Sequence, residues 1–468
     1  MQILFRSSSE SPLPGLGVIP SQITRFDDND KSVPHIGWNS TDLQEDTDVD
    51  APYYYFVHSY CAKHDPENDP QAAMWAHTTT QYGNEVFISS VRRGNVFATQ
   101  FHPEKSGEAG LALLDEWLHN PIINHNPSKP INKPIKPMHI WTKRIIACMD
   151  VRANDEGDLV VTKGDQYDVR EKAANNPTTV ITKTAGTVRN LGKPVALAAR
   201  YYASGADELC LLNITSFRHS PLQDQPMLAV VRAAAECVFV PLTIGGGIKD
   251  TVDPDGTKRS ALEVAGAYFR AGADKVSIGS EAVYAVERLR ETGNADGTSA
   301  IEMIAHVYGR QAVVVSIDPR RVYVDPGTYD GRYKDELAQG SPDGPENERG
   351  KAWWYQCTVS GGRESRQVSV VELAQGVQAL GAGEILLNSI DRDGTGLGFD
   401  LDLLRIVKRS VRIPVIASSG AGKIQHFVDA FTKTDVEAAL AAGIFHRGEV
   451  QISEIKETLR TAHVNVRG

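Results

Sequence analysis

Short apolar runs alternate with longer amphipathic stretches over most of the chain. Eight runs have the character of buried strands: RIIACMDV, ELCLLNIT, VFVPLTIGGG, DKVSIGS, AVVVSIDP, EILLNSID, IPVIASSG and AALAAGIFH. Strands that are apolar on both faces and alternate with helices are typical of parallel sheets. Residues 142–468 therefore predict an α/β fold of the (β/α)8 type, a TIM barrel.

The barrel segment also repeats itself. IIACMDV is echoed by VVVSIDP, GADELCLLN by GAGEILLN, and VPLTIGGGIKD by IPVIASSGAGK. The offsets between matching residues are 168 (Asp150 and Asp318), 176 (Glu208 and Glu384) and 173 (Pro241 and Pro414). A nearly constant offset over three motifs predicts a half-barrel duplication, with four strand–helix units in each half.

Residues 119–141 contain five prolines and little periodicity, which predicts an extended linker between two domains, 1–118 and 142–468. The block before the linker contains strand-like runs but looks like part of a domain rather than a whole one. Within the barrel, residues 322–366 are polar, rich in Gly, Pro and Tyr, and too long for a barrel loop. We expect a surface insertion there, after the fifth strand.

Composition narrows the classes of partner. A net charge of −10 and the lack of a basic patch argue against nucleic acid, and no apolar run could cross a membrane or serve as a secretory leader. We therefore expect a cytoplasmic protein. A monomer is compatible with the sequence. The five cysteines are far apart, without CxxC spacing, so neither a metal site nor a disulfide is expected, and no cofactor is implied.

Two aspartates end the first and fifth predicted strands, Asp150 and Asp318. Active sites of (β/α)8 enzymes lie at the carboxyl ends of the strands, so these carboxylates would face each other across the barrel mouth. Such a pair suits general acid and general base catalysis on one substrate. Alternatively, each aspartate only caps the loop that follows it.

Glycine-rich segments follow the third and seventh predicted strands, TIGGGIKD and ASSGAGK, and small residues follow the fourth and eighth, SIGS and AAGIF. Glycine lets backbone N–H groups approach phosphate oxygens closely. Their equivalent positions in the two halves predict two phosphate sites at opposite rims, although each segment alone could be a tight turn. A substrate with a phosphate at each end would fit.

Charged residues stand at the other ends of the predicted strands: Arg144, Glu208, Lys275 and Glu384. They could form a ring that closes the bottom of the barrel, or they could serve only stability. Lys163 lies in VVTKGDQYDVRE, where a glycine-bearing loop could close over an anionic substrate, or where a lysine could simply face solvent.

Together, RIIACMDVRANDEGDLVVTKGDQYDVRE, VPLTIGGGIKD, GADKVSIGS, GAGEILLNSIDRDGTG and IPVIASSGAG resemble the cyclase barrel of the imidazole glycerol phosphate synthase family. PHIGWNS, YFVHSY and FATQFHPEKSG resemble the glutaminase, a class I glutamine amidotransferase domain of α/β type, that fungi and plants fuse to that barrel. The resemblance covers nearly the whole chain. It implies histidine biosynthesis, in which ammonia released from glutamine reaches the barrel.

The resemblance also implies roles for individual residues. Asp150 and Asp318 would share the catalytic acid and base roles, and Lys163 would be the residue of the mobile loop. The four charged residues at the bottom of the barrel would be an ammonia gate. Contacts to the bis-phosphorylated substrate would come from Asn213, Gly246, Gly247, Gly279, Ser280, Ser389, Asp393, Gly394, Thr395, Ser419, Gly420, Ala442 and Gly443. Bacterial members often have aspartate at the position of Asn213, so we expect this residue to position rather than to transfer protons.

His102 and Glu104 have the spacing of a base and its orienting group in a nucleophilic hydrolase, and the resemblance assigns them these roles in the glutaminase. The cysteine they would serve belongs upstream of a segment like MQILF, where this sequence begins, so we expect a partial glutaminase without its nucleophile. Cys61 lacks the glycine elbow of such a nucleophile. The expected partners are thus a phosphorylated substrate and ammonia.

Two other functions stay open at this point. A phosphoribosyl isomerase of the same barrel group would also need two aspartates and two phosphate sites, but it would need neither the ring of charges nor a glutaminase block. A barrel that only binds a separate glutaminase as a scaffold would not need Asp150, Asp318 and Lys163.

Overall fold

The structure is a computed structural model of residues 1–468. It describes the chain except for residues 44–51, 121–140, 154–158, 164–166, 169–180, 185–186, 191, 215–225, 254, 341, 343–345 and 347. The chain divides into two compact units, one of residues 1–144 with 465–468 and the other of residues 145–464. The predicted linker lies largely outside the described residues. The last four residues belong to the first unit, whereas the predicted boundaries gave them to the barrel.

Eight parallel strands form the closed barrel of the second unit, as the pattern of apolar runs predicts. They are β10 (Arg144–Ala153), β15 (Glu208–Asn213), β16 (Leu242–Gly245), β19 (Lys275–Ile278), β20 (Val313–Ile317), β25 (Glu384–Asn388), β26 (Val415–Ser418) and β27 (Ala438–Ala441). They pair in this order, and β27 pairs with β10 to close the barrel. The duplicated motifs occupy equivalent strands, four in each half.

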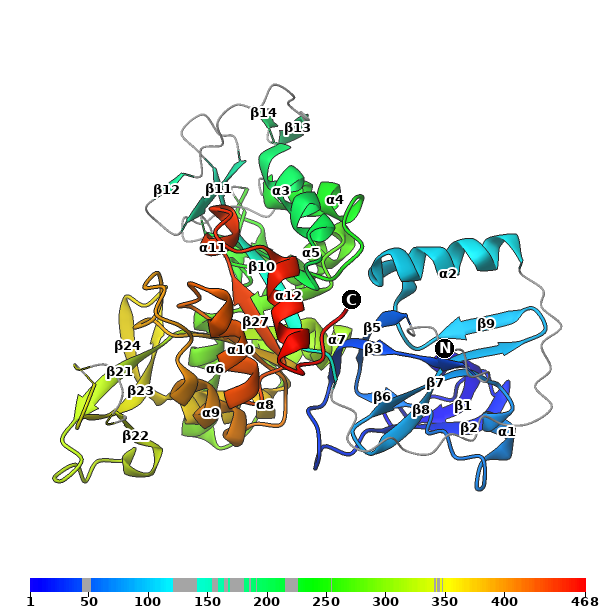
Figure 1. Ribbon diagram of the computed structural model, residues 1–468, viewed down its shortest axis with the longest axis horizontal. Helices are drawn as coiled ribbons and strands as arrows, with labels where there is room; N and C mark the ends of the chain where they lie inside the picture. Colours follow the sequence, from blue (N-terminus) through cyan, green and yellow to red (C-terminus); the bar gives the residue numbers. More distant parts are fainter. Residues whose placement is uncertain are drawn as a thin grey trace. The chain divides into compact units, whose positions relative to one another are not determined.

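Helices follow the strands and surround them (Figure 1). They are α3 (Gly192–Ala203), α4 (Pro226–Ala235), α5 (Ala261–Ala271), α6 (Ser280–Thr292), α7 (Ala300–Tyr308), α8 (Val370–Leu380), α9 (Leu401–Ser410), α10 (Ile424–Lys433), α11 (Gly443–His446) and α12 (Ile452–Thr461). Local sequence sets several of their ends. Capping boxes start α5, α7 and α8, and left-handed glycines end α5, α6 and α8.

The residues of the predicted insertion form a four-stranded antiparallel sheet, drawn in yellow in Figure 1. Its strands are β21 (Pro319–Val324), β22 (Ala338–Gln339), β23 (Ala352–Val359) and β24 (Glu364–Ser369). Trp353, Tyr355 and Cys357 on β23 are buried, so the sheet has packed side chains of its own. It begins three residues before the predicted insertion and ends three residues after it.

Smaller elements complete the second unit. β11 (Leu159–Lys163) and β12 (Tyr167–Asp168) extend the barrel sheet from β10. Two hairpins are formed by β13 (Ile181–Thr184) with β14 (Thr187–Asn190) and by β17 (Thr251–Val252) with β18 (Lys258–Arg259), and single turns of 3-10 helix occur at Arg310–Ala312 and Lys334–Glu336.

The described part of the first unit contains three small sheets. β1 (Phe5–Ser8), β2 (Ile19–Arg25) and β6 (Tyr60–Cys61) form one, β3 (His35–Ser40) pairs with β5 (Tyr53–His58), and β4 (Asp42–Leu43), β7 (Ala76–Tyr82), β8 (Glu85–Arg93) and β9 (Val96–Thr99) form the third. Its helices are α1 (Pro70–Ala73) and α2 (Gly107–His119), with 3-10 turns at Gln2–Leu4 and Pro103–Lys105. Two apolar clusters, around Phe5 and around Phe56, pack these elements.

Candidate functional site

Asp318 follows β20 directly, at the carboxyl end of the strand. Its Oδ1 accepts a hydrogen bond of 2.8 Å from Asn388 Nδ2 on the neighbouring β25, and Ser316 Oγ lies 3.5 Å away. Its backbone carbonyl accepts hydrogen bonds from the N–H and the hydroxyl of Thr358 on β23. Partners from a barrel strand and from the insertion thus fix both the carboxylate and the backbone of this residue.

Burial raises the pKa of Asp318 above its usual value, because the charged form loses solvent. The hydrogen bonds from Asn388 and Ser316 act in the opposite direction, and the nearby Asp393 carboxylate adds to the increase. A carboxyl group with a raised pKa is protonated more often near neutral pH and is therefore a better proton donor.

Asp150 lies in β10, opposite Leu212 of β15 and opposite Thr162 of β11. Because β10 and β20 are the first and fifth strands of an eight-stranded barrel, Asp150 and Asp318 come from opposite sides of the same mouth. Lys163 is the last residue of β11, so its backbone belongs to a strand rather than to a loop. The side chain of Lys163 lies outside the described residues, as does most of the segment after it.

Alternation along the strands separates the polar residues near the mouth into two sets. On β25, Glu384, Leu386 and Asn388 share one face, which is the interior face, because Leu386 belongs to the barrel's interior cluster. Ser389 follows on the other face, is 1% exposed and donates a weak hydrogen bond of 3.4 Å to Asp400. Asn388 is therefore a polar neighbour of Asp318 that the motif comparison missed, although counting every second residue from Glu384 would have found it.

Asn213 ends β15 at the position that matches Ser389 in the second half of the barrel. It is buried, and its side chain hydrogen-bonds the hydroxyl of Tyr268 on α5. Burial raises the pKa of that tyrosine, so the hydroxyl stays protonated. Asn213 thus contacts a helix outside the barrel, and contact of Asn213 or Ser389 with substrate stays a prediction.

The glycines of the first predicted phosphate rim follow two paired strands, since Gly245 of β16 lies opposite Ser277 of β19. Gly246 and Gly247 have positive φ angles of 88° and 78°. A Cβ atom on Gly246 would lie 2.2 Å from the carbonyl oxygen of Asn213, so only glycine fits there. Gly279 and Ser280 begin α6, and a Cβ atom on Gly279 would meet no heavy atom within 4 Å.

In the second predicted rim, the loop after the seventh strand touches the loop after the sixth strand. The N–H of Gly398 donates a hydrogen bond of 2.8 Å to the carbonyl of Gly420, and a Cβ atom on Gly420 would lie 2.3 Å from the carbonyl of Gly398. The loop with Asp393, Gly394 and Thr395 is therefore adjacent to the loop with Ser419 and Gly420. Ala442 and Gly443 follow the next strand, β27, at the start of α11.

Three of the four predicted gate residues meet at the amino ends of the strands. Lys275 Nζ lies 2.6 Å from Glu208 Oε1 and 2.7 Å from Glu384 Oε2, and all three side chains are at most 1% exposed. Thr243 donates a 2.6 Å hydrogen bond to Glu208. Arg144 begins β10 and is fully buried, and its membership of the ring stays a prediction.

An apolar interior lies between this ion cluster and the mouth of the barrel. It consists of Ile146, Cys148, Cys210, Val314, Leu386, Ile416, Ala438 and Leu440. The barrel is thus packed with small and medium side chains between its charged lower end and its polar upper end.

In the first unit, His102 Nδ1 lies 2.9 Å from Glu104 Oε1. Burial opposes the charge on Glu104, but the hydrogen bond and charge of His102 outweigh it and lower the pKa of this carboxyl group. Hydrogen bonds hold the segment against β5: His102 N–H donates to the carbonyl of Tyr55, and Ser106 Oγ bridges Tyr55 N–H and the His102 carbonyl. With Nδ1 facing Glu104, Nε2 is the nitrogen suited to act as a base.

Cys61 ends β6 and is fully buried in the cluster around Phe56. Burial raises the pKa of its thiol well above the usual value, so it carries no reactive thiolate. All five cysteines of the chain are described, and all are free thiols. Within the described residues, no cluster of three or more His, Cys, Asp or Glu side chains could hold a metal ion. No described helix is long and apolar enough to span a membrane.

Comparisons with known proteins show which family the chain resembles. A family model described as "Histidine biosynthesis protein" matches residues 144–451. Imidazole glycerol phosphate synthase hisHF of Schizosaccharomyces pombe is 52% identical to this chain, over all of the chain and 85% of that protein. The chloroplastic hisHF of Arabidopsis thaliana is 54% identical over all of the chain and 76% of its own length. Subunit HisF of Methanosarcina mazei is 36% identical over 70% of this chain and 99% of its own length.

Proposed function

The chain belongs to the imidazole glycerol phosphate synthase family of histidine biosynthesis proteins, and we propose that its barrel catalyses the cyclase reaction at the mouth that carries Asp150 and Asp318. Ammonia reacts with a bis-phosphorylated formimino aminoimidazole carboxamide ribonucleotide. The products are imidazole glycerol phosphate and aminoimidazole carboxamide ribotide. The partners are the phosphorylated nucleotide and ammonia. We further propose that the chain is monomeric and cytoplasmic.

The observation that carries the proposal is the placement of the glycine-rich turns, which are the two predicted rims, on either side of the two strands that carry the carboxylates. One rim follows β16 and β19, the third and fourth strands, and the other follows β25, β26 and β27, the sixth to eighth. Backbone N–H groups in such glycine-rich turns suit phosphate oxygens. A substrate with a phosphate at each end would span the mouth and present its centre to Asp150 and Asp318.

We assign proton donation to Asp318 and proton abstraction to Asp150. The raised pKa of Asp318 favours its protonated form, and Asn388 fixes the orientation of its carboxyl group. Asp150 would take the proton released as ammonia adds and the imidazole ring closes. Asp318 would protonate the leaving group, the aminoimidazole carboxamide ribotide. Lys163 would hold the loop over the substrate.

The ion cluster of Lys275, Glu208 and Glu384 favours this reaction over that of a phosphoribosyl isomerase. Burial of three charges costs desolvation, so the cluster is weak evidence for stability alone. An isomerase consumes no ammonia and needs no charged entrance below its site. In the first unit, His102 and Glu104 keep the geometry of a glutaminase base and its orienting carboxylate.

The test is cyclisation by the purified chain with either an ammonium salt or glutamine, followed by formation of imidazole glycerol phosphate. We expect turnover with ammonium and none with glutamine, because Cys61 is buried and unactivated and is the single cysteine of residues 1–120. Absence of ammonium-dependent product would refute the cyclase assignment. Glutamine-dependent turnover would refute the expectation that this chain has no glutaminase activity.

Asp318→Asn is the matched control for the assay. It keeps the shape of the side chain but removes the titrating proton, so turnover should fall by about a hundredfold or more. Unchanged turnover in this variant would refute the assignment of proton donation to Asp318. Sugar isomerisation of a phosphoribosyl substrate by the wild-type chain would favour the isomerase.

A further inference from the structure

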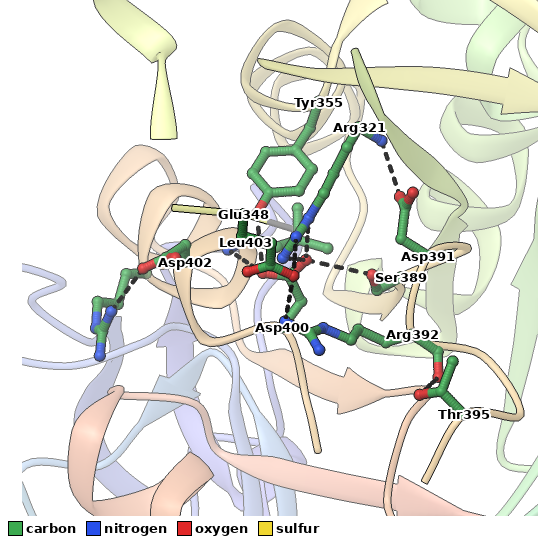
Figure 2. A network of polar contacts seen from close by, with 11 residues as sticks. Arg321, Glu348, Tyr355, Ser389, Asp391, Arg392, Thr395, Asp400, Asp402 and Leu403 are labelled. Carbon is green, nitrogen blue, oxygen red and sulfur yellow. Dashed lines mark hydrogen bonds and ion pairs between the residues drawn. The ribbon is translucent and has the colours of Figure 1, made fainter. Parts of the chain in front are cut away.

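Arg321 on β21 is a buried cation three residues after Asp318. Its guanidinium bonds two carboxylates: Nη2 and Nε lie 2.7 and 3.1 Å from Asp400 Oδ2, and Nη1 lies 2.7 Å from Glu348 Oε1 (Figure 2). The guanidinium lies over the Trp353 ring, with 4.2 Å between the guanidinium carbon and the ring centre. The side chains of Arg321 and Asp400 are each 2% exposed.

Asp400 ends the loop that leads from β25 to α9. One of its oxygens accepts hydrogen bonds from the Tyr355 hydroxyl at 2.8 Å and from the N–H of Leu403, which caps α9. The other binds Arg321, and Ser389 Oγ lies 3.4 Å from it. The last residue of the loop is therefore bound to two strands of the insertion sheet.

The start of the loop contacts the same arginine. The N–H of Arg321 donates a 2.8 Å hydrogen bond to Asp391 Oδ2. Arg392, the next residue, has Nη2 3.1 Å from the Glu348 oxygen that also binds Arg321. Figure 2 shows the side chains of the loop and of the insertion converging on Asp400 and Arg321.

Three contacts thus attach the loop of residues 391–400 to Arg321. Asp391 binds the Arg321 N–H, and Asp400 binds its guanidinium. Arg392 is linked to Arg321 through Glu348. Gly394 and Thr395 lie between these anchors. A hydrogen bond of 3.2 Å from Ile390 N–H to the Pro319 carbonyl joins the loop to the residue directly after Asp318. The chain segment that carries Asp318 therefore also carries the anchor of the loop.

Stability alone is a poor explanation of this arrangement. Removing an arginine and two carboxylates from water costs several kcal/mol per ion, and apolar residues often replace such networks without loss. A network of this kind defines one geometry, because a guanidinium fork bonds only at fixed angles. What this network defines is the position of the 391–400 loop relative to Asp318.

We propose that Arg321 is a positioning residue: it places the 391–400 loop so that the backbone around Gly394 and Thr395 binds one phosphate of the substrate. This inference rests on the proposed cyclase function. It also gives the insertion sheet a role, since Arg321 and Tyr355 lie on its strands and Glu348 lies between β22 and β23. Arg321 acts through the loop, and Asp150 and Asp318 remain the groups that act on the substrate.

The test compares Arg321→Lys with Arg332→Lys. Lysine keeps the charge but offers a single ammonium group in place of the fork. Arg332 is also in the insertion, but it is exposed and pairs with Glu372, outside the loop. At saturating ammonium, Arg321→Lys should raise KM for the bis-phosphorylated nucleotide about tenfold with kcat changed less than about threefold, while Arg332→Lys changes neither by more than about twofold.

Glu348→Gln is a milder second variant, because it keeps the shape of the side chain and leaves the contact of Arg321 with Asp400 in place. It should raise KM by about threefold. If Arg321→Lys does not fold, this variant decides alone. An unchanged KM in the folded variants, accompanied only by a lower melting temperature, would overturn the inference and leave the network a purely structural role.

A second measurement is independent of turnover. Hydrogen exchange of peptides covering residues 389–400 should slow when inorganic phosphate is added to the wild-type chain, and this protection should be lost in Arg321→Lys but kept in Arg332→Lys. Equal protection in all three chains would overturn the inference. A wild-type chain that shows the protection but no ammonium-dependent turnover would refute the cyclase function and not the placement of the loop.

Discussion

The side-chain amide of Asn388 donates a hydrogen bond of 2.8 Å to Oδ1 of Asp318, and the same amide lies 2.9 Å from Ser316 Oγ. The amide favours the ionised form of the carboxyl group, whereas burial favours the protonated form and raises the pKa overall. Asn388 therefore tunes the titration of a proposed catalytic group through one neutral hydrogen bond.

Replacing Asn388 by alanine should raise the pKa of Asp318 further, because the variant loses a hydrogen bond that stabilises the carboxylate. The limb of the pH–rate profile that belongs to Asp318 should move to higher pH by about one unit. This direction holds whether Asp318 acts as an acid or as a base, since both limbs follow its pKa. Ammonium-dependent cyclisation measured over a range of pH values checks it.

Thr358→Val is the control for that profile. The Thr358 hydroxyl bonds the backbone carbonyl of Asp318 and not its carboxyl group, so its removal should leave the pH limb in place. A limb that moves equally in both variants would mean that general loosening of the strand, and not the amide, controls the titration.

The two glycines Gly279 and Gly246 should respond differently to alanine. A Cβ atom at Gly279 meets no atom of the protein within 4 Å, so Gly279→Ala should lower the melting temperature less than Gly246→Ala does. The methyl group would stand where the first rim is expected to receive phosphate, so KM for the nucleotide should rise about tenfold.

Gly246→Ala should instead damage the fold, because its φ of 88° disfavours any side chain and the Cβ atom would overlap the Asn213 carbonyl. We expect a loss of about 2 kcal/mol or more in the free energy of unfolding. A stable Gly246→Ala variant, or a Gly279→Ala variant with unchanged KM, would contradict these expectations; thermal unfolding and steady-state kinetics measure both.

Replacing Lys275 by methionine should destabilise the barrel. Glu208 and Glu384 would remain buried at the bottom without their shared cation, which costs about 3–5 kcal/mol when a buried pair is broken. Lys433→Met is a matched control, because Lys433 is exposed and pairs with Asp429 on the surface, where a pair contributes less than about 1 kcal/mol. Urea unfolding of the two variants distinguishes these values, and equal losses would show that the cluster is not the buried ion set described above.

His58 should make the first unit less stable at mildly acidic pH. Its Nδ1 faces the carbonyl of Tyr60 at 2.9 Å, so Nδ1 carries the proton, and Nε2 then accepts from His35 Nδ1 at 3.3 Å. Burial lowers the pKa of His58 from 6.5 to about 4. The unfolded chain therefore binds a proton between these values that the folded chain does not, and stability falls as the pH decreases through this window.

Between about pH 7 and about pH 5 this loss should reach about 2 kcal/mol. Urea titrations followed by circular dichroism at the two pH values measure it. His58→Gln should flatten the pH dependence, whereas replacement of the exposed His119 by glutamine should not. A slope unchanged by His58→Gln would assign the acid sensitivity to another group.

The sequence by itself was sufficient to predict the barrel, its duplication and the positions of the strand ends. Apolar runs, helix caps such as Ser260 with Glu263, and glycines with positive φ such as Gly246 act over a few residues, so they can be recognised along the chain. Asp318 was predicted as a site residue for the same reason, because it directly follows an apolar strand.

The contacts of these residues were decided only by the tertiary structure. Lys275 and Glu384 are 109 residues apart, Arg321 and Asp400 are 79 apart, and Asn388 and Asp318 are 70 apart. Each pair meets because strand register, barrel closure or the fold of the insertion brings distant segments together, and none of these follows from local periodicity. A shift of one residue in the register of β25 would place Ser389 instead of Asn388 beside Asp318, so the contact itself depends on the register that the closed barrel sets.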